Sequence, residues 1–373
     1  MTKLHNANLK RTALYHLHVE AGAKLVAFAG YEMPLHYPDG IIAEHRYTRS
    51  SASLFDVSHM GQIVLRGTKV AEALEALVPG DIARLKKGQM RYTMLTNENG
   101  GILDDLIVTN VGSHLLLVVN AGRKEADFNY LRTHLPNTIG VDLLKDRGLI
   151  AVQGPAAAHV LDRYVSGVAK MPFMSSYLVD WDGSMISITR SGYTGEDGYE
   201  ISMPFGAVSR ITSQLLAENG VKLAGLGARD SLRMEAGLCL YGKDIDETTT
   251  PIEAGLKWSI GKRRREEGNF LGAKQIQKHL TDGAPRVRVG ILTQGKVPAR
   301  SGTIITDVAG TKIGMVTSGG FGPTAGRPVA MGYVDGTSGV NNTKVNLLVR
   351  EKPRLGHIVS MPFIPHNYYR NKE

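Results

Sequence analysis

The sequence predicts an α+β protein with more than one domain, in which the last domain is all-β. The chain has 373 residues, more than one hydrophobic core usually organises. Helix-like and strand-like stretches are mixed up to about residue 280, whereas short strand runs separated by Gly, Pro and Asp follow from Arg286 onward. We therefore expect regions 1–280 and 281–373, with the second folding as a small β-barrel or sandwich.

Apolar residues at helical spacing, followed in places by glycine, predict the helices. Leu14, Leu17 and Ala21 share one helical face before Gly22, and Gly220 ends a later helix in the same way. The predicted helices cover 10–21, 41–51, 69–77, 124–134, 156–164, 208–219 and 228–236.

Runs rich in Val, Ile, Leu and Thr between turn residues predict the strands. The clearest pair is 91–96 and 102–109, because Asn97 to Gly101 has the chemistry of a hairpin turn. Segment 28–34 has no regular period and is too apolar for an exposed loop, so we expect it to line another part of the molecule. The predicted strands cover 62–66, 91–96, 102–109, 115–119, 149–152, 185–189, 199–203, 287–292, 303–305, 312–316, 329–334 and 345–349.

The composition is that of an ordinary globular protein, with 42% hydrophobic and 21% charged residues. No apolar run approaches the ~18 residues of a membrane helix, and the N-terminus lacks the apolar core of a signal peptide. The single cysteine, Cys239, excludes an internal disulfide and a thiolate metal cluster, and its apolar neighbours predict a buried structural thiol. These features predict an intracellular compartment and no membrane partner.

The chain is basic, with 44 Lys and Arg against 35 Asp and Glu and a net charge of +9. Such a charge favours an anionic partner. The basic residues are scattered except for Lys262 to Arg265, where no aromatic residues interleave as a nucleic-acid stacking surface requires. We expect this cluster to be a solvated loop and expect no nucleic-acid partner.

The glycine-rich stretch 190–202, RSGYTGEDGYEIS, predicts a polar turn between two strands. Tyr199 and Ile201 would share one face of the second strand, with Glu200 on the other. Because Glu is rarely buried without a partner, Glu200 lies either in water or in a pocket.

Asp104 and Asp105 interrupt an apolar strand, a setting that strand propensity disfavours. Neighbouring residues face opposite ways, so only one of the two can point at a given pocket. Something local must hold this carboxylate, and both a ligand and a backbone turn satisfy that need.

No dinucleotide fingerprint, P-loop, HExxH or CxxC motif occurs, and His59 stands alone. The residues therefore support an enzyme or a binding protein with carboxylates near apolar and aromatic walls, and they leave the reaction open. We expect no metal site.

Seven motifs carry a resemblance to a known family, and they occur in one order from about residue 10 to residue 369. They are FAGYEMP (28–34), FDVSHMG (55–61), NENGGILDDLIV (97–108), GYTGEDGYEIS (192–202), AGLGARDSLRMEAGLCLYG (224–242), TPIEAGL (250–256) and TSGGFGPT (317–324). Together they resemble the aminomethyltransferases, or T-proteins, of the glycine cleavage system.

The resemblance implies a three-domain cloverleaf around a central folate channel, with mixed antiparallel-sheet domains and a C-terminal all-β barrel. Region 1–280 would hold two interleaved α+β subdomains, one of them at roughly 55–145. The implied reaction takes an aminomethyl group from the dihydrolipoyl arm of H-protein, releases ammonia and converts tetrahydrofolate to 5,10-methylenetetrahydrofolate. The implied partners are lipoylated H-protein and tetrahydrofolate as co-substrate.

The resemblance also implies the site residues. The catalytic acid falls on Asp105. The folate-binding positions fall on Glu200, Arg229, Tyr368, Tyr92, Met60, Asn120 and Tyr193. The chemistry agrees, since one carboxylate such as Glu200 accepts both adjacent N–H groups of a pterin, and Arg229 offers a fork of donors. Asp105 would either move a proton or stabilise a developing positive charge.

Rival functions come from related and unrelated classes. A folate-dependent demethylase normally adds a dinucleotide-binding domain, for which this chain has no fingerprint. A sulfonium methyltransferase relative would bind a free small molecule and would not need H-protein. A non-catalytic folate-binding factor for iron–sulfur assembly carries a motif of the type KGCYxGQE, and GLCLYGKD around Cys239 does not match it.

Two departures from the family pattern concern local packing. Gly322 and Ala325 stand in a motif that is usually closer to TSGxFSPTL, and Tyr31 stands where tryptophan is common. Lipoyl carrier domains are acidic, so we expect a basic face, the Lys262 to Arg265 cluster or another, to meet H-protein. The expected compartment is the cytoplasm, or the mitochondrial matrix if the source is eukaryotic.

Overall fold

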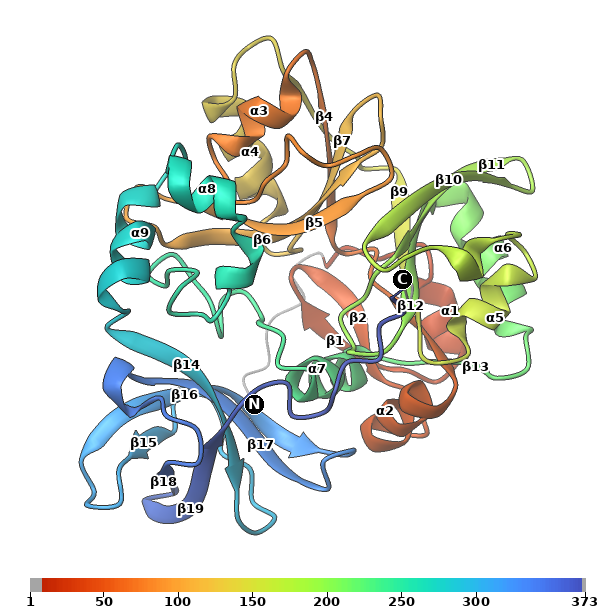
Figure 1. Ribbon diagram of the computed structural model, residues 1–373. Helices are drawn as coiled ribbons and strands as arrows, with labels where there is room; N and C mark the ends of the chain where they lie inside the picture. Colours follow the sequence, from red (N-terminus) through yellow and green to blue (C-terminus); the bar gives the residue numbers. More distant parts are fainter. Residues whose placement is uncertain (1–8, 371–373) are drawn as a thin grey trace.

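The computed structural model describes residues 9–370 and has three lobes, each built on its own sheet (Figure 1). One lobe contains a five-stranded sheet, the second a six-stranded sheet, and the third a closed six-stranded barrel. The predicted α+β class with a C-terminal β-barrel is thereby confirmed. The residue boundaries of the domains stay a prediction.

The first lobe, orange at the top of Figure 1, carries the Asp104–Asp105 strand. Its sheet has the order β5 (Met90–Thr96), β6 (Ile102–Asn110), β7 (Leu115–Val119), β4 (Gly61–Arg66) and β8 (Gly140–Leu143), with helices α3 (Val70–Glu75) and α4 (Lys124–His134). Asn97 Oδ1 accepts the backbone N–H groups of Asn99 and Gly101, both at 2.9 Å, and so closes the predicted hairpin turn.

A β-bulge shapes β6 next to this turn. Thr96 pairs with Ile102 and Leu95 with Asp104, which leaves Leu103 as the extra residue. Leu103 consequently joins the apolar cluster that contains Leu131 of α4, whereas Ile102 packs in a different cluster with Cys239. The bulge sets which face each following aspartate occupies.

The second lobe carries the glycine-rich turn. Its sheet has the order β10 (Ser175–Trp181), β11 (Ser184–Arg190), β12 (Gly198–Pro204), β9 (Arg147–Gln153), β3 (Ala52–Asp56) and β13 (Val221–Leu223). Helices α1 (Tyr15–Glu20), α5 (Ala157–Asp162) and α6 (Phe205–Leu216) and the short helix η1 (Val168–Lys170) belong to it. Tyr199 and Ile201 are fully buried in its core, while Glu200 is partly exposed on the other face, as the alternation predicts.

The third lobe is the blue barrel in Figure 1. Its strands follow the order β14 (Arg286–Thr293), β17 (Arg327–Asp335), β16 (Lys312–Gly322), β15 (Ile304–Thr306), β18 (Lys344–Val349) and β19 (Lys352–Val359), with the short helix η3 (Gly336–Ser338). Closure of the barrel leaves no free strand edges within it.

The remaining elements connect the lobes. They are the hairpin β1 (Lys24–Phe28) and β2 (Tyr31–His36), and helices α2 (Ile41–Ser50), α7 (Leu226–Glu235), η2 (Lys257–Ser259), α8 (Lys262–Glu267) and α9 (Ala273–Asp282). Arg233 of α7 reaches Asp244 at 2.6 Å and Ser318 of the barrel at 2.9 Å, so buried polar contacts join α7 to the barrel. No helix within residues 9–370 is long and apolar enough to cross a membrane.

The basic cluster differs from its sequence-based expectation. Residues 262–267 form helix α8, and Arg264 is fully buried. Arg263 pairs with Glu75 at 2.5 Å and with Asp81 at 2.6 Å. The expectation of a solvated loop is therefore wrong, because two of the four basic side chains hold α8 against the first lobe instead of facing water.

Gly322, one of the two departures, lies where a side chain would collide with a buried carboxylate. A Cβ at this position would stand 2.9 Å from Oε1 of Glu235. That carboxylate accepts the backbone N–H groups of Thr324 at 2.8 Å and Ala325 at 3.0 Å, and it pairs with Arg49 at 3.1 Å. The missing side chain at Gly322 thus leaves room for Glu235 to bind the barrel loop.

Candidate active site

Asp105 is held by two side chains at the inner end of the first lobe. The hydroxyl of Tyr92 on β5 donates to Oδ2 of Asp105 at 3.0 Å, and Nδ2 of Asn120 donates to Oδ1 at 2.7 Å. Tyr92 lies on β5, Asp105 on β6, and Asn120 directly after β7. Three neighbouring strands of one sheet therefore bring these side chains together. The carboxyl group keeps lone pairs free for a further donor.

Burial raises the pKa of Asp105 from 3.8 to about 7, and the neighbouring carboxyl of Asp104 adds to the rise. The hydrogen bonds from Tyr92 and Asn120 act in the opposite direction. A carboxyl group with this pKa exchanges its proton readily at neutral pH, which suits acid–base catalysis.

Arg229 and Glu200 form a second polar group around Tyr193. The guanidinium of Arg229, at the start of α7, lies 4.8 Å from the ring centre of Tyr193. Burial lowers the pKa of Arg229, while the charge of Glu200 acts to raise it, so Glu200 is a charged neighbour of Arg229. Ser191 Oγ donates to Oε2 of Glu200 at 3.0 Å. Nη1 of Arg229 is buried and has no hydrogen-bond partner among residues 9–370.

Tyr193 connects the two groups. Its hydroxyl donates to the carbonyl of Cys239, and burial raises its pKa, with the charges of Asp105 and Arg229 also acting on it. Burial raises the pKa of Tyr92 as well, with Asp105 and Tyr193 among its neighbours. Asp105 and Arg229 are therefore both neighbours of Tyr193, which links the two polar groups.

The last two candidate residues, Met60 and Tyr368, have different surroundings. Met60 packs against the apolar cluster that includes Phe55 and Ala228. Ala228 directly precedes Arg229 in α7. Tyr368 stacks on Phe173 with ring centres 4.1 Å apart, and its charged neighbours are Arg49, Glu196 and Arg370. The structure brings six of the eight candidates together around Tyr193, places Met60 beside them, and shows no contact of Tyr368 with Asp105 among the described residues.

All eight candidate residues are partly exposed, which separates them from the core and from the freely solvated surface. This exposure is typical of the wall of a binding site. Sequence reasoning missed Trp258, which stacks on Tyr92 with ring centres 5.4 Å apart and is 68% exposed. The signal in the sequence that could have identified it was a tryptophan beside the charged segment that begins at Lys262.

Two other sequence-based expectations concern Cys239 and His59. Cys239 is buried, and burial raises its pKa to about 12, which fits the predicted structural thiol. His59 is buried against Phe28, and burial lowers its pKa to about 4, so it is neutral. No cluster of His, Cys, Asp and Glu with metal-binding geometry occurs in the part of the chain that the structure describes.

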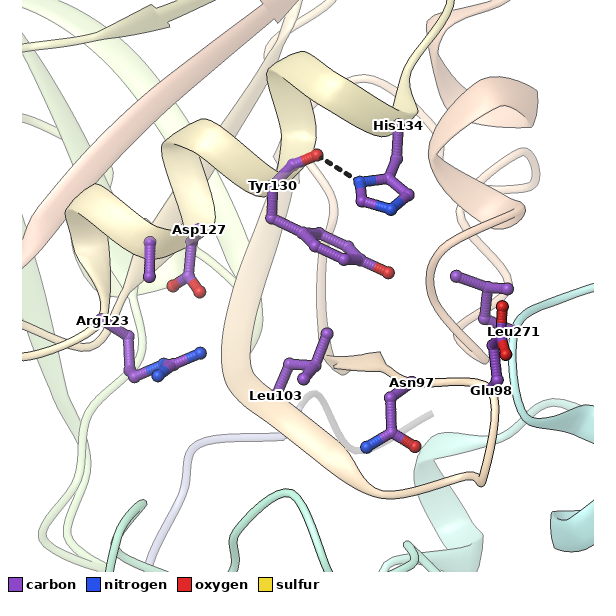
Figure 2. A pocket seen from close by; sticks show the side chains of 9 residues that line it. Asn97, Glu98, Leu103, Arg123, Asp127, Tyr130, His134 and Leu271 are labelled. Carbon is purple, nitrogen blue, oxygen red and sulfur yellow. Dashed lines mark hydrogen bonds between the residues drawn. The ribbon is translucent and has the colours of Figure 1, made fainter.

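Figure 2 shows a cavity of about 420 Å³ beside α4 and the β5–β6 turn. Arg123, Asp127 and Tyr130 of α4 line one side, and Leu103 and Asn97 line another. Asp127 connects this cavity to Asp104, because the carboxyl groups of Asp104 and Asp127 lie within hydrogen-bond reach of each other.

The fold is that of an α+β protein, and its candidate site brings together carboxylates, an arginine and aromatic rings, the groups that suit a polar ring ligand. Residues 14–264 match the GCVT N-terminal domain, and residues 286–364 match the glycine cleavage T-protein C-terminal barrel domain. The chain belongs to the glycine cleavage T-protein family, and its activity is that of an aminomethyltransferase.

Relatives and a solved structure agree over nearly the whole chain. The mitochondrial aminomethyltransferase of Mesembryanthemum crystallinum is 45% identical over 98% of this chain and 92% of its own length. That of Dictyostelium discoideum is 44% identical over 96% of this chain and 94% of its own length. The crystal structure of glycine cleavage system aminomethyltransferase T from Bartonella henselae superposes with a TM-score of 0.93, at 46% identity over 97% of this chain and 100% of that one.

Proposed function

We propose that the chain transfers the aminomethyl-derived carbon from the dihydrolipoyl arm of lipoylated H-protein to tetrahydrofolate, releasing ammonia and forming 5,10-methylenetetrahydrofolate. Family membership supports the reaction class. The observation that carries the proposal is Asp105, a partly exposed carboxyl group that Tyr92 and Asn120 hold by hydrogen bonds near Tyr193 and that has a pKa of about 7.

The residues present fit the folate. Nη1 of Arg229 is a buried donor without a partner among the described residues, and a polar ligand would satisfy it. Glu200 is partly exposed beside it and can accept two adjacent N–H groups, as a pterin edge presents. Tyr92, Tyr193 and Met60 supply flat and apolar walls for the rings, Asn120 holds the carboxyl of Asp105, and Tyr368 serves the outer part of the ligand.

Bound tetrahydrofolate supplies the nucleophilic nitrogens that accept the carbon. The ionised carboxylate of Asp105 accepts a proton from such a nitrogen, and the resulting acid returns it to the departing amine. The total number of protons is unchanged, because the folate gives up two and the amine and the lipoyl sulfur each gain one. The hydrogen bonds from Tyr92 and Asn120 fix the carboxylate orientation, and a positioned acid–base group of this kind contributes about 10²–10⁴-fold in rate.

The partner assignments rest on charge and on the family. A net charge of +9 supports electrostatic docking of an acidic lipoyl carrier, so association with H-protein slows as salt increases. Insensitivity of the association rate to salt would contradict this. No observation favours a demethylase, a sulfonium methyltransferase or an iron–sulfur assembly factor. We propose the cytoplasm as the compartment, or the mitochondrial matrix in a eukaryote, since the relatives from Mesembryanthemum crystallinum and Dictyostelium discoideum are named mitochondrial.

The test is turnover of aminomethyl-loaded H-protein, with ammonia and methylenetetrahydrofolate measured together. The proposal predicts equal amounts of both products and none when either tetrahydrofolate or H-protein is omitted. Transfer from a free sulfonium compound or from dimethylglycine in place of H-protein would instead identify one of the rival enzymes. Folate binding without any turnover would support the assembly factor.

A further inference from the structure

The buried pair Asp104 and Asp127 lies outside the site assigned above and touches it through one residue. Asp104 is 0% exposed and Asp127 is 1% exposed. Nδ2 of Asn120 donates to Oδ1 of Asp104 at 2.9 Å and to Oδ1 of Asp105 at 2.7 Å, so those two oxygens lie within about 6 Å of each other. The backbone N–H of Asn120 also donates to Oδ2 of Asp104 at 3.0 Å.

No cation within residues 9–370 forms an ion pair with either member of this pair. None of the ion pairs within residues 9–370 includes Asp104, Asp105 or Asp127. Oδ2 of Asp127 and Nε of Arg123 are both buried without a hydrogen-bond partner in the same part of the chain. Two buried carboxyl groups within hydrogen-bond reach of each other cannot both be charged at neutral pH, so they share a proton.

The charged and titratable groups near Asp104 and Asp127 come from α4, the β5–β6 turn and the segment around Tyr241. Arg123, the N-cap residue directly before α4, has its charge near Asp127 and lies over the ring of Tyr241 at 5.5 Å. Tyr241 in turn faces Asp104, Asp127 and Glu247. Glu98, Tyr130 and His134 line the cavity of Figure 2 on the solvent side of Asp127. Asp127 therefore stands between Asp104 and a cavity through which water can supply the shared proton.

We propose that Asp104 and Asp127 act as positioning residues for the reaction: they share one proton, Asp104 holds the amide of Asn120 in place, and the pair thereby sets the charge state of Asp105. The inference rests on the proposed function of Asp105. The hydrogen-bond geometry explains why an apolar strand carries two adjacent aspartates, since one faces the ligand and the other faces α4. The pKa of Asp104, which burial and then Asp127 raise to about 8, agrees with a shared proton.

The test compares the acid limb of the kcat profile against pH in Asp104→Asn and Asp127→Asn. Asp104→Asn removes the carboxyl next to Asp105, so the limb moves to lower pH by about one unit. In Asp127→Asn the new amide donates to Asp104, which becomes fully charged at neutral pH, so the limb moves to higher pH. Glu125→Gln, which removes an exposed charge from the same turn of α4, leaves the limb in place.

A purely structural role would lower activity in both variants without moving the limb, and that result would overturn the proposal, as would shifts in the same direction. Infrared titration of the unliganded protein gives a readout independent of turnover. In an Asp105→Asn background at neutral pH, the carbonyl band of one protonated carboxyl is expected, and it disappears with either further substitution. Absence of that band would refute the shared proton even if the proposed reaction held. If the carbonyl band is present but wild-type protein shows no turnover, the proposed reaction is rejected, whereas the shared proton of Asp104 and Asp127 stands.

Discussion

Glu200 is only partly exposed, and neighbouring polar groups replace part of the water that it loses. The alternation along β12 places Tyr199 and Ile201 in the core and directs Glu200 to the face where Arg229 lies. Ser191 donates one hydrogen bond to Oε2. Glu200 therefore has acceptor capacity left for a ligand.

Glu200→Gln is expected to weaken tetrahydrofolate binding by about 2 kcal/mol, or roughly 30-fold in Kd, because a charge-assisted hydrogen bond is replaced by a neutral one. Calorimetric titration measures this change. Asp182→Asn is the matched control, since it removes a carboxylate from the β10–β11 turn of the same sheet that is well exposed. A Kd for Glu200→Gln equal to that of the control would remove Glu200 from the folate site.

Stability should depend on pH through Asp104. Its pKa is raised from 3.8 to about 8, so the folded protein binds this proton more tightly than the unfolded chain. That contribution is fully present below about pH 4 and is lost as pH rises through 8. Wild type loses this contribution between pH 5 and pH 8, and Asp104→Asn does not. The free energy of unfolding of the variant minus that of wild type should therefore rise by at least about 1 kcal/mol over this range. Denaturation midpoints at the two pH values measure this, and an opposite trend would show that Asp104 is ionised in the folded state.

At the residue scale, the sequence indicated unusual positions better than it indicated their partners. The adjacent aspartates contradict strand propensity, which is visible without a structure. Their partners Tyr92 and Asn120 lie 13 and 15 positions from Asp105 and were named only through the family resemblance. Asp127 was missed because an acid in the first turn of a helix is ordinarily solvated and favourable there.

At the scale of elements, α8 shows how a charged segment becomes part of the interior. Arg264 reaches the carbonyl of Val78 at 3.2 Å and the carboxylate of Glu75 at 3.5 Å from a fully buried position. Lys262, two residues earlier, is 83% exposed. Two basic residues on one short helix are therefore placed differently: one is exposed and the other is buried. The helix periodicity decides which side chain faces the first lobe.

Arg264→Ala is expected to lower the free energy of unfolding by about 2–5 kcal/mol, because it empties a fully buried site and leaves the carbonyl groups of Glu75 and Val78 without their guanidinium donor. Lys262→Ala should change it by less than about 0.5 kcal/mol, since its ion pair is exposed. Chemical denaturation of both variants provides the comparison. Equal, small effects would indicate that α8 contributes little to holding the first lobe.

Some elements were predicted to within a residue or so, and length did not decide which ones were missed. The hairpin β5–β6 and helix α4 follow their predicted ranges to within a residue or so. The prediction missed β1–β2, β3, β8, β10, β13, β19 and α9 and started α1 too early. The hairpin β1–β2 turns at Ala29 and Gly30, both with positive φ, so the break falls inside an apolar run that offers no polar turn signal.

At the scale of the whole molecule, the lobes are assembled from distant segments. Strand β13 pairs in parallel with β3, and Ser51 bonds the carbonyl of Gly220 across 169 positions of sequence. Periodicity reports only local neighbours, so the three-lobed arrangement was available only from the family resemblance. The barrel was predictable because its strands are consecutive in sequence and separated by turn residues.

The central claim is that Asp105 performs the acid–base step of aminomethyl transfer between the lobes. The most direct measurement is kcat of Asp105→Asn with loaded H-protein and tetrahydrofolate, in a variant whose circular dichroism and folate affinity match wild type. The predicted result is a loss of about 10²–10⁴-fold in kcat, because the amide cannot exchange the proton. A variant that turns over at the wild-type rate would contradict the claim and reduce Asp105 to a structural residue.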